Sequence, residues 1–128
     1  MTTGTHAPNP GTQDPLVGDL RRAGLLPLLV LHFAAQGRCY GNMLMERITG
    51  MTQGALAVNP NTMYPLLRTL EARGLITGEW EHPERRSRRF YAITPAGEEE
   101  RERLGEELGP RLERIQASIQ NIRDEVFG

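Results

Sequence analysis

The chain has 128 residues, 15 basic and 16 acidic side chains, a formal net charge of −1 and 38% hydrophobic residues. This length suits one domain with a modest core, and the composition is that of a globular protein rather than a collagen-like or wholly disordered one. The longest apolar run, 25–35, has about half the length of a membrane span and contains Pro27 and His32, which argues against a transmembrane helix. A near-neutral total argues against nucleic acid as a partner only if the charges are evenly spread.

The cations and the single cysteine carry further information. Every cation is an arginine, whose planar guanidinium suits bidentate contact with phosphate or guanine. The N-terminus lacks the basic-then-apolar pattern of a signal peptide, and Cys39 has no second cysteine for an internal disulfide. These features predict a cytoplasmic protein.

The first half of the chain predicts a tail and three helices. Residues 1–14 are rich in Thr, Gly, Pro and Asn, which predicts a disordered tail. Pro15 can open a short helix to Arg22, and Pro27 a second helix to Ala35 that is apolar almost all round and therefore central. A third helix fits Tyr40–Thr49, with Gly50 as its end.

The clearest helix start lies at Asn59, which can cap a helix with Pro60 at its first position. The predicted helix, Pro60–Arg73, has a buried stripe at spacings of three and four, formed by Met63, Leu66, Leu67 and Leu70. After Gly74 the pattern alternates, which predicts strands at 75–81 and 88–94 joined by the turn 82–87. The tip and second strand of this β-hairpin carry four arginines: Arg85, Arg86, Arg88 and Arg89.

A last helix is expected over 95–128, capped by Thr94. Its apolar residues form a heptad seam two positions in seven wide, made of Leu108, Leu112, Ile115, Ile119, Ile122 and Val126. So narrow a seam favours packing on a second copy of the chain; the alternative is that it packs on its own domain. Gly109 and Pro110 interrupt the pattern and are expected to kink or split the helix.

The near-neutral total hides two oppositely charged segments. Residues 15–94 hold 10 arginines and 6 acids, net +4, whereas residues 95–128 hold 5 arginines and 9 acids, net −4. The chain therefore divides into a tail (1–14), a basic unit (15–94) and an acidic C-terminal helix (95–128).

Polar side chains in the basic unit indicate that its partner is DNA. Away from the leucine stripe, helix Pro60–Arg73 carries Asn61, Tyr64 and Arg68, with Thr62 nearby. Such side chains bind base edges and phosphates. The arginine-rich tip suits a nucleic-acid backbone or minor groove; the alternative is a solvated turn. The predicted order is two helices with a turn, a third helix that exposes polar donors, and then a basic hairpin. This order predicts a mainly α winged helix-turn-helix.

Two motifs also resemble the PadR family of bacterial transcriptional regulators. The stretch NPNTMYPLLRTLEARGLI (59–76) resembles the opening of that family's recognition helix, and RRFYAITPAG (88–97) resembles its wing strand and the entry to its C-terminal helix. Tyr40, Gly41 and Leu44 match the Tyr-Gly-x-x-Leu opening of the preceding helix, whereas Asn42 and Met43 depart from it. Arg85 and Arg86 make this wing tip more basic than is usual.

The resemblance implies a homodimeric repressor that binds a pseudo-palindromic operator in double-stranded DNA and dimerises through its C-terminal helix and an N-terminal helix. A single C-terminal helix is similar to the short-tailed branch of the family. By position, Tyr40, Thr62 and Tyr64 would contact DNA, chiefly its backbone. The residue pattern adds Asn59, Asn61, Arg68 and the four wing arginines.

Other functions have weaker support. Cys39, His6, His32 and His82 form no enzyme or metal motif, so no catalytic residue, metal or cofactor is predicted. A thiol or metal sensor using Cys39 and His32 and a dimeric interaction module without DNA binding remain alternatives. Trp80 either packs beneath the hairpin or flanks a pocket for a small-molecule effector whose identity the sequence leaves open.

Overall fold

The structure, a computed structural model, describes residues 15–128; the predicted tail at 1–14 lies outside this range. It contains five helices and one hairpin: α1 (Pro15–Arg22), α2 (Leu25–Ala35), α3 (Gly41–Met51), α4 (Pro60–Ala72), β1 (Ile76–Trp80), β2 (Arg89–Ile93) and α5 (Pro95–Phe127). The predicted mainly α fold with one β-hairpin and a long C-terminal helix is confirmed. Among residues 15–128, no helix combines the length and apolarity needed to cross a membrane.

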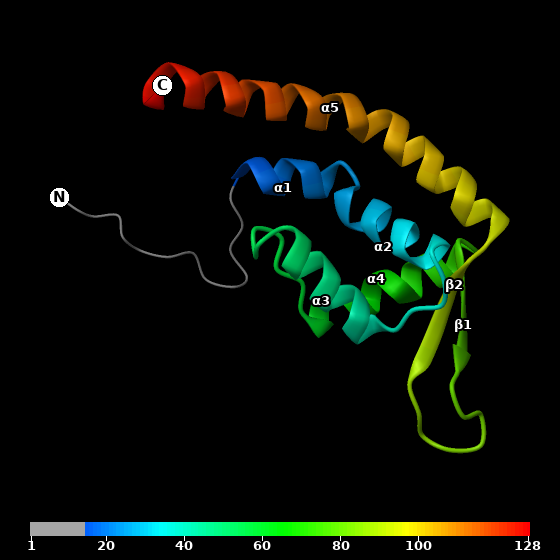
Figure 1. The fold of residues 1–128 in the computed structure, drawn as a ribbon. Coiled ribbons are helices and arrows are strands. Elements are labelled where there is room, and N and C mark those ends of the chain that lie inside the picture. Colours follow the sequence, from blue (N-terminus) through cyan, green and yellow to red (C-terminus); the bar gives the residue numbers. More distant parts are fainter. Residues whose placement is uncertain (1–14) are drawn as a thin grey trace.

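The other helices lie on two sides of α2, which is at the centre of the fold. Figure 1 shows α5 running over α1 and α2, while α3 and α4 lie on the other side and the hairpin projects away from α5. Val30 and Leu31 of α2 are completely buried, which confirms its central position. Fully or almost fully buried side chains from the other elements surround it, including Leu44, Ile48, Met63, Leu67, Leu70 and Ile76.

The two predicted helix caps are confirmed. The Asn59 side-chain oxygen accepts a hydrogen bond from the Thr62 backbone N–H at 3.1 Å, which fixes the start of α4. The Thr94 hydroxyl accepts one from the Gly97 N–H at 3.0 Å at the start of α5. In both places the cap satisfies an N–H that has no partner within its own helix.

Two helix boundaries differ from the prediction by more than one residue. The second helix begins at Leu25 rather than Pro27, because a proline in the first turn replaces an N–H that needs no helical partner. The third helix continues through Gly50 to Met51. The chain turns only afterwards, where Gln53 has a φ of 51° and Gly54 a φ of 80°.

The hairpin is antiparallel as predicted, with each strand one residue shorter at both ends. Its register runs from the Ile76–Ile93 pair to the Trp80–Arg89 pair. Cys39 pairs with the outer edge of β2, which no sequence pattern indicated: its N–H and C=O each hydrogen-bond to Tyr91, at 3.0 and 2.8 Å. This pairing places the residues before α3 beside the wing.

The C-terminal helix is continuous from Pro95 to Phe127, so the expected split at Gly109 and Pro110 is wrong. Pro110 is exposed, and the helix keeps its course because the ring removes one backbone donor while the other hydrogen bonds persist. Figure 1 shows a gently curved helix. Leu108 is completely buried within the single chain; it therefore belongs to the chain's own core and not to a surface that a second copy can contact.

Candidate nucleic-acid interface

The polar face of α4 lies opposite its buried stripe. Asn61 and Arg68 are exposed and Tyr64 is half-buried, whereas Met63 and Leu67 are completely buried. The helical period of 3.6 residues causes this separation. The N-terminal turn of α4 therefore presents amide, hydroxyl and guanidinium groups outward. Asn59 is also exposed, but its side-chain oxygen is already used in the cap, which leaves its amide N–H₂ as the free group.

The start of α3 packs closely against this face. A Cβ atom on Gly41 would lie 2.7 Å from the ring of Tyr64, so only glycine permits this approach. The Tyr64 hydroxyl lies 3.5 Å from the side-chain oxygen of Asn42, to which it donates a long hydrogen bond. Tyr64 is therefore held between the two helices, with its hydroxyl at the surface they share.

Tyr40, at the N-terminus of α3, lies in a stack that crosses to the wing. Its ring is 4.4 Å from that of Phe90, and the guanidinium of Arg88 lies 3.9 Å from the Tyr40 ring centre. A second guanidinium group, that of Arg38, lies 4.2 Å from the centre of the Phe90 ring. Cation–π contacts of this kind fix the orientation of guanidinium groups at a surface. The Cys39–Tyr91 pairing explains why these residues meet.

The wing tip is closed by Ser87. Its hydroxyl accepts a hydrogen bond from the His82 N–H at 2.9 Å and donates one to the His82 carbonyl at 3.0 Å. The tip is thus an ordered turn that carries Arg85 and Arg86 at the far end of the hairpin. Both arginines are exposed, and neither forms an ion pair with any residue from 15 to 128.

The other two wing arginines have intramolecular partners. Arg88 pairs with Glu81 across the hairpin at 3.0 Å, and this hydrogen bond holds the pKa of the Glu81 carboxyl below its usual range. Arg89 pairs with Glu71 of α4 at 2.7 Å. The four arginines that the sequence groups together therefore differ: Arg85 and Arg86 keep their full charge for a partner, whereas Arg88 and Arg89 are partly neutralised.

Comparisons with known proteins decide the family. A family model described as the PadR-like family of transcriptional regulators matches residues 30–103, from α2 to the start of α5. The chain belongs to this family. A transcriptional regulator of Mycobacterium tuberculosis is 39% identical over 70 residues, which cover 55% of this chain and 63% of that protein.

Solved structures support the PadR-like fold. A PadR family transcriptional regulator from Eggerthella lenta is 26% identical with a TM-score of 0.64, and the match covers 81% of this chain and 88% of that one. A transcriptional regulator from Clostridium thermocellum superposes with a TM-score of 0.67 over 77% of this chain and 93% of that one. At 24% identity, the second likeness supports the fold alone.

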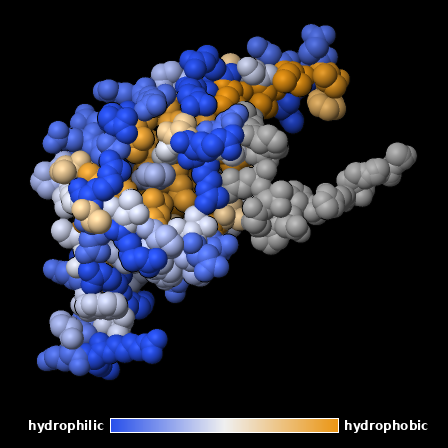
Figure 2. Space-filling model, turned by 180° about the vertical axis from the view of Figure 1, so that it is seen from behind, coloured by the Kyte–Doolittle hydropathy of each residue, from blue (hydrophilic) through white to orange (hydrophobic). Residues whose placement is uncertain are grey.

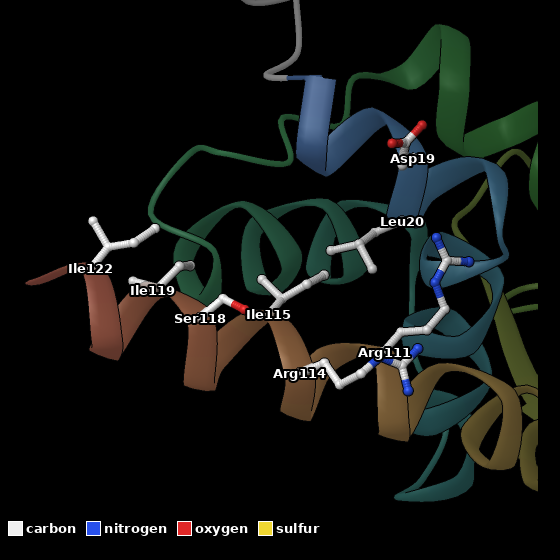
Figure 3. A pocket seen from close by; sticks show the side chains of 8 residues that line it. All are labelled: Asp19, Leu20, Arg111, Arg114, Ile115, Ser118, Ile119 and Ile122. Carbon is white, nitrogen blue, oxygen red and sulfur yellow. The ribbon is translucent and has the colours of Figure 1, made fainter.

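The C-terminal half of α5 exposes the rest of the predicted seam in this PadR-like chain. Leu112, Ile119, Ile122 and Val126 are 38%, 47%, 59% and 64% exposed, respectively, and Ile115 is half-buried. Figure 2 shows this apolar strip along the projecting end of the helix. An open groove of about 580 Å³ lies between α1 and α5. In Figure 3, Leu20 of α1 faces Ile115 of α5 across it.

Trp80 and Cys39 lie in very different surroundings. Trp80 is 53% exposed at the end of β1, its ring stacks on Arg89 at 5.0 Å, and the groove between α1 and α5 is lined by other residues. Cys39 is completely buried, and burial raises the pKa of its thiol to about 11. Within the described range, no cluster of three or more metal-ligating side chains includes Cys39 or His32.

Three residues of this interface were not indicated by the sequence, namely Arg38, Glu71 and Ser87, and Asn42 was noted only as a departure from the family's pattern. Arg38 and Tyr40 are two residues apart, a spacing that puts them on one face of an extended segment. The sequence did not identify that segment as extended. Glu71 and Arg89 are 18 residues apart, and nothing local connects them. Ser87 lies in a turn whose composition predicts a bend without indicating which side chain closes it.

Proposed function

We propose that this PadR-like protein is a homodimeric transcriptional repressor that binds specific double-stranded DNA. The observation that carries the proposal is the separation of charge: the polar face of α4 and the wing tip lie on the basic part of the chain, and the acidic helix α5 runs along the opposite side (Figure 1). DNA approaching the wing therefore meets Arg85 and Arg86 and remains distant from the carboxylates of α5. Repression follows the family resemblance, and a cytoplasmic location follows the sequence features of the N-terminus and the single cysteine.

In this proposal α4 enters the major groove. Asn61, Thr62 and Arg68 contact base edges or phosphates, because amide, hydroxyl and guanidinium groups are the donors and acceptors that both require. Tyr40 and Tyr64 contact the backbone, and the wing tip follows an adjacent phosphate strand or minor groove. Arg85 and Arg86 contribute most of the wing's electrostatic attraction, because the cations of Arg88 and Arg89 already have carboxylate partners.

The second copy is proposed to dock on α5. A heptad seam of exposed isoleucine, leucine and valine side chains is complementary to another helix with the same spacing. The seam runs along the groove beside α1, so one partner helix can cover both. Two-fold symmetry would place two recognition helices in successive major grooves, and the operator is accordingly expected to be pseudo-palindromic. The predicted pocket for a small-molecule effector beside Trp80, which is 53% exposed at the end of β1, stays a prediction.

Selection from a random duplex library tests the proposal. The purified protein is expected to enrich one pseudo-palindromic sequence, and its affinity for that duplex should fall log-linearly with salt, with a slope near −0.9 for each phosphate neutralised. A matched duplex with scrambled sequence provides the control. If no sequence is enriched and salt leaves partner binding unchanged, the proposal is wrong and the interaction-module alternative is favoured.

A further inference from the structure

Arg89 and Glu71 connect the two elements of the proposed DNA interface. Arg89 belongs to β2 in the wing and Glu71 to the last turn of α4. Their side chains pair at 2.7 Å and are 27% and 33% exposed, respectively. Both partners are therefore only partly exposed, whereas in each ion pair between residues of α5 at least one partner is half exposed or more.

Neighbours fix the Arg89 guanidinium on two further sides. A Cβ atom on Gly78 would lie 2.6 Å from Arg89 Nε, so the arginine lies directly over this glycine and uses the space that a side chain would fill. Trp80, the cross-strand partner of Arg89, stacks with its ring centre 5.0 Å from the guanidinium carbon. A planar group held by a carboxylate, an aromatic face and a glycine backbone has one orientation, which a lysine ammonium cannot reproduce.

We infer that Arg89 and Glu71 are a positioning pair that fixes the wing relative to the recognition helix and thereby contributes to sequence specificity. This inference rests on the proposed DNA-binding function. The hairpin is a two-stranded sheet that projects from the domain, and such a ribbon needs an anchor to hold one angle. When the angle is fixed, α4 and the wing tip can contact only those duplexes whose grooves match it.

The positioning role and a direct phosphate contact by Arg89 predict opposite results. If Arg89 positions the wing, Glu71→Gln loses specificity although it makes the protein more positive. If Arg89 binds DNA directly, Glu71→Gln releases the cation, and affinity for the selected duplex increases. Glu79→Gln is the matched control, because this substitution removes the same charge. Glu79 is exposed on β1 and has no ion-pair partner among residues 15–128.

The experiment measures the ratio of affinities for the duplex selected by the unmodified protein and for a scrambled duplex of equal length. We expect Glu71→Gln and Arg89→Gln each to lower the ratio about fivefold, which is the effect on affinity expected from the loss of one partly exposed ion pair. The double variant should lose no more than either single change. Glu79→Gln should raise both affinities together and leave the ratio unchanged. Thermal unfolding of each variant shows whether the fold is retained, and Arg89→Lys replaces any variant that does not fold.

Three outcomes would overturn the inference while leaving the proposed function intact: an unchanged ratio in Glu71→Gln, losses that add in the double variant, or a loss of stability without a change in the ratio. Failure of the unmodified protein to select any duplex would instead overturn the proposed function together with this inference. A hydroxyl-radical footprint gives a second measurement. The positioning role predicts that Glu71→Gln weakens protection at the outer positions reached by the wing and preserves the positions reached by α4.

Discussion

Gly97 lies directly against the backbone of Leu75: a Cβ atom on Gly97 would be 2.1 Å from the Leu75 carbonyl oxygen. The same oxygen accepts a hydrogen bond from the Thr94 N–H at 3.1 Å, and the Thr94 hydroxyl donates to the Gly74 carbonyl at 2.6 Å. The first turn of α5 is thus joined to the turn between α4 and β1. This junction links the proposed dimerisation helix to the recognition helix.

Gly97→Ala is therefore expected to destabilise the protein strongly. The atom that a methyl group would meet is backbone and cannot rotate away, so we expect a loss of about 3 kcal/mol in the free energy of unfolding. Urea denaturation measures it. Gly105→Ala, on the same helix with no atom within 4 Å of the added Cβ, is the control and should gain about 0.5 kcal/mol. Equal stability of the two variants would contradict the close approach.

Removal of both wing-tip arginines should reduce the salt dependence of DNA binding. Arg85→Ala with Arg86→Ala is expected to make the slope of log affinity against log salt shallower by about 0.9 for each lost phosphate contact, hence by up to about 3.6 in a dimer. A fluorescence-anisotropy titration at several salt concentrations measures it. Arg101→Ala with Arg103→Ala removes the same charge from α5 and should leave the slope almost unchanged. Similar slopes for both double variants would show that the wing tip does not contact DNA.

Charges placed in the exposed seam should produce a folded monomer. Ile119 and Ile122 are about half exposed in the single chain, so Ile119→Glu with Ile122→Glu should prevent dimerisation and leave the core intact. Sedimentation gives the mass, and circular dichroism gives the helix content. Ala117→Glu with Asn121→Glu adds two charges on the opposite face of α5 and should remain dimeric. A dimer that persists in the seam variant would place the interface elsewhere.

The stability of the protein should decrease in alkaline solution. Burial raises the pKa of the Cys39 thiol from 9.0 to about 11, and burial also raises the pKa of Tyr91. The unfolded chain therefore loses these protons first, and the free energy of unfolding falls as pH rises from 9 towards 11. Urea denaturation at a series of pH values should show this fall, with a smaller fall in Cys39→Ala because only the Tyr91 contribution remains.

The same burial should protect Cys39 from thiol reagents. A shift of two pKa units lowers the thiolate fraction about 100-fold at pH 8, and the side chain is also inaccessible to the reagent. Modification by an aromatic disulfide reagent should accordingly be slow in the native protein and fast in urea. Rapid modification of the native protein would favour the thiol-sensor alternative.

The helices and hairpin of the fold were predictable because local interactions specify them. Asn59 and Thr94 are side-chain caps, the α4 stripe follows the helical period, and the alternation after Gly74 marks strands. Helix boundaries were harder to predict at residues that often end helices but here lie inside them. Gly50 lies inside α3, and Pro110 lies inside a continuous α5. In both places the remaining backbone hydrogen bonds of the helix outweighed a single unfavourable residue.

The candidate interface was predictable in composition and not in arrangement. The sequence by itself determined which side chains face away from the α4 core, and that four arginines gather at the wing, because these features depend on helical period and proximity along the chain. Only the tertiary structure decided that Arg88 and Arg89 are held by Glu81 and Glu71, while Arg85 and Arg86 have no ion-pair partner between residues 15 and 128. It also assigned Leu108 to the chain's own core. The physical reason is that ion pairing and burial depend on distances between residues far apart in the sequence, which no local pattern encodes.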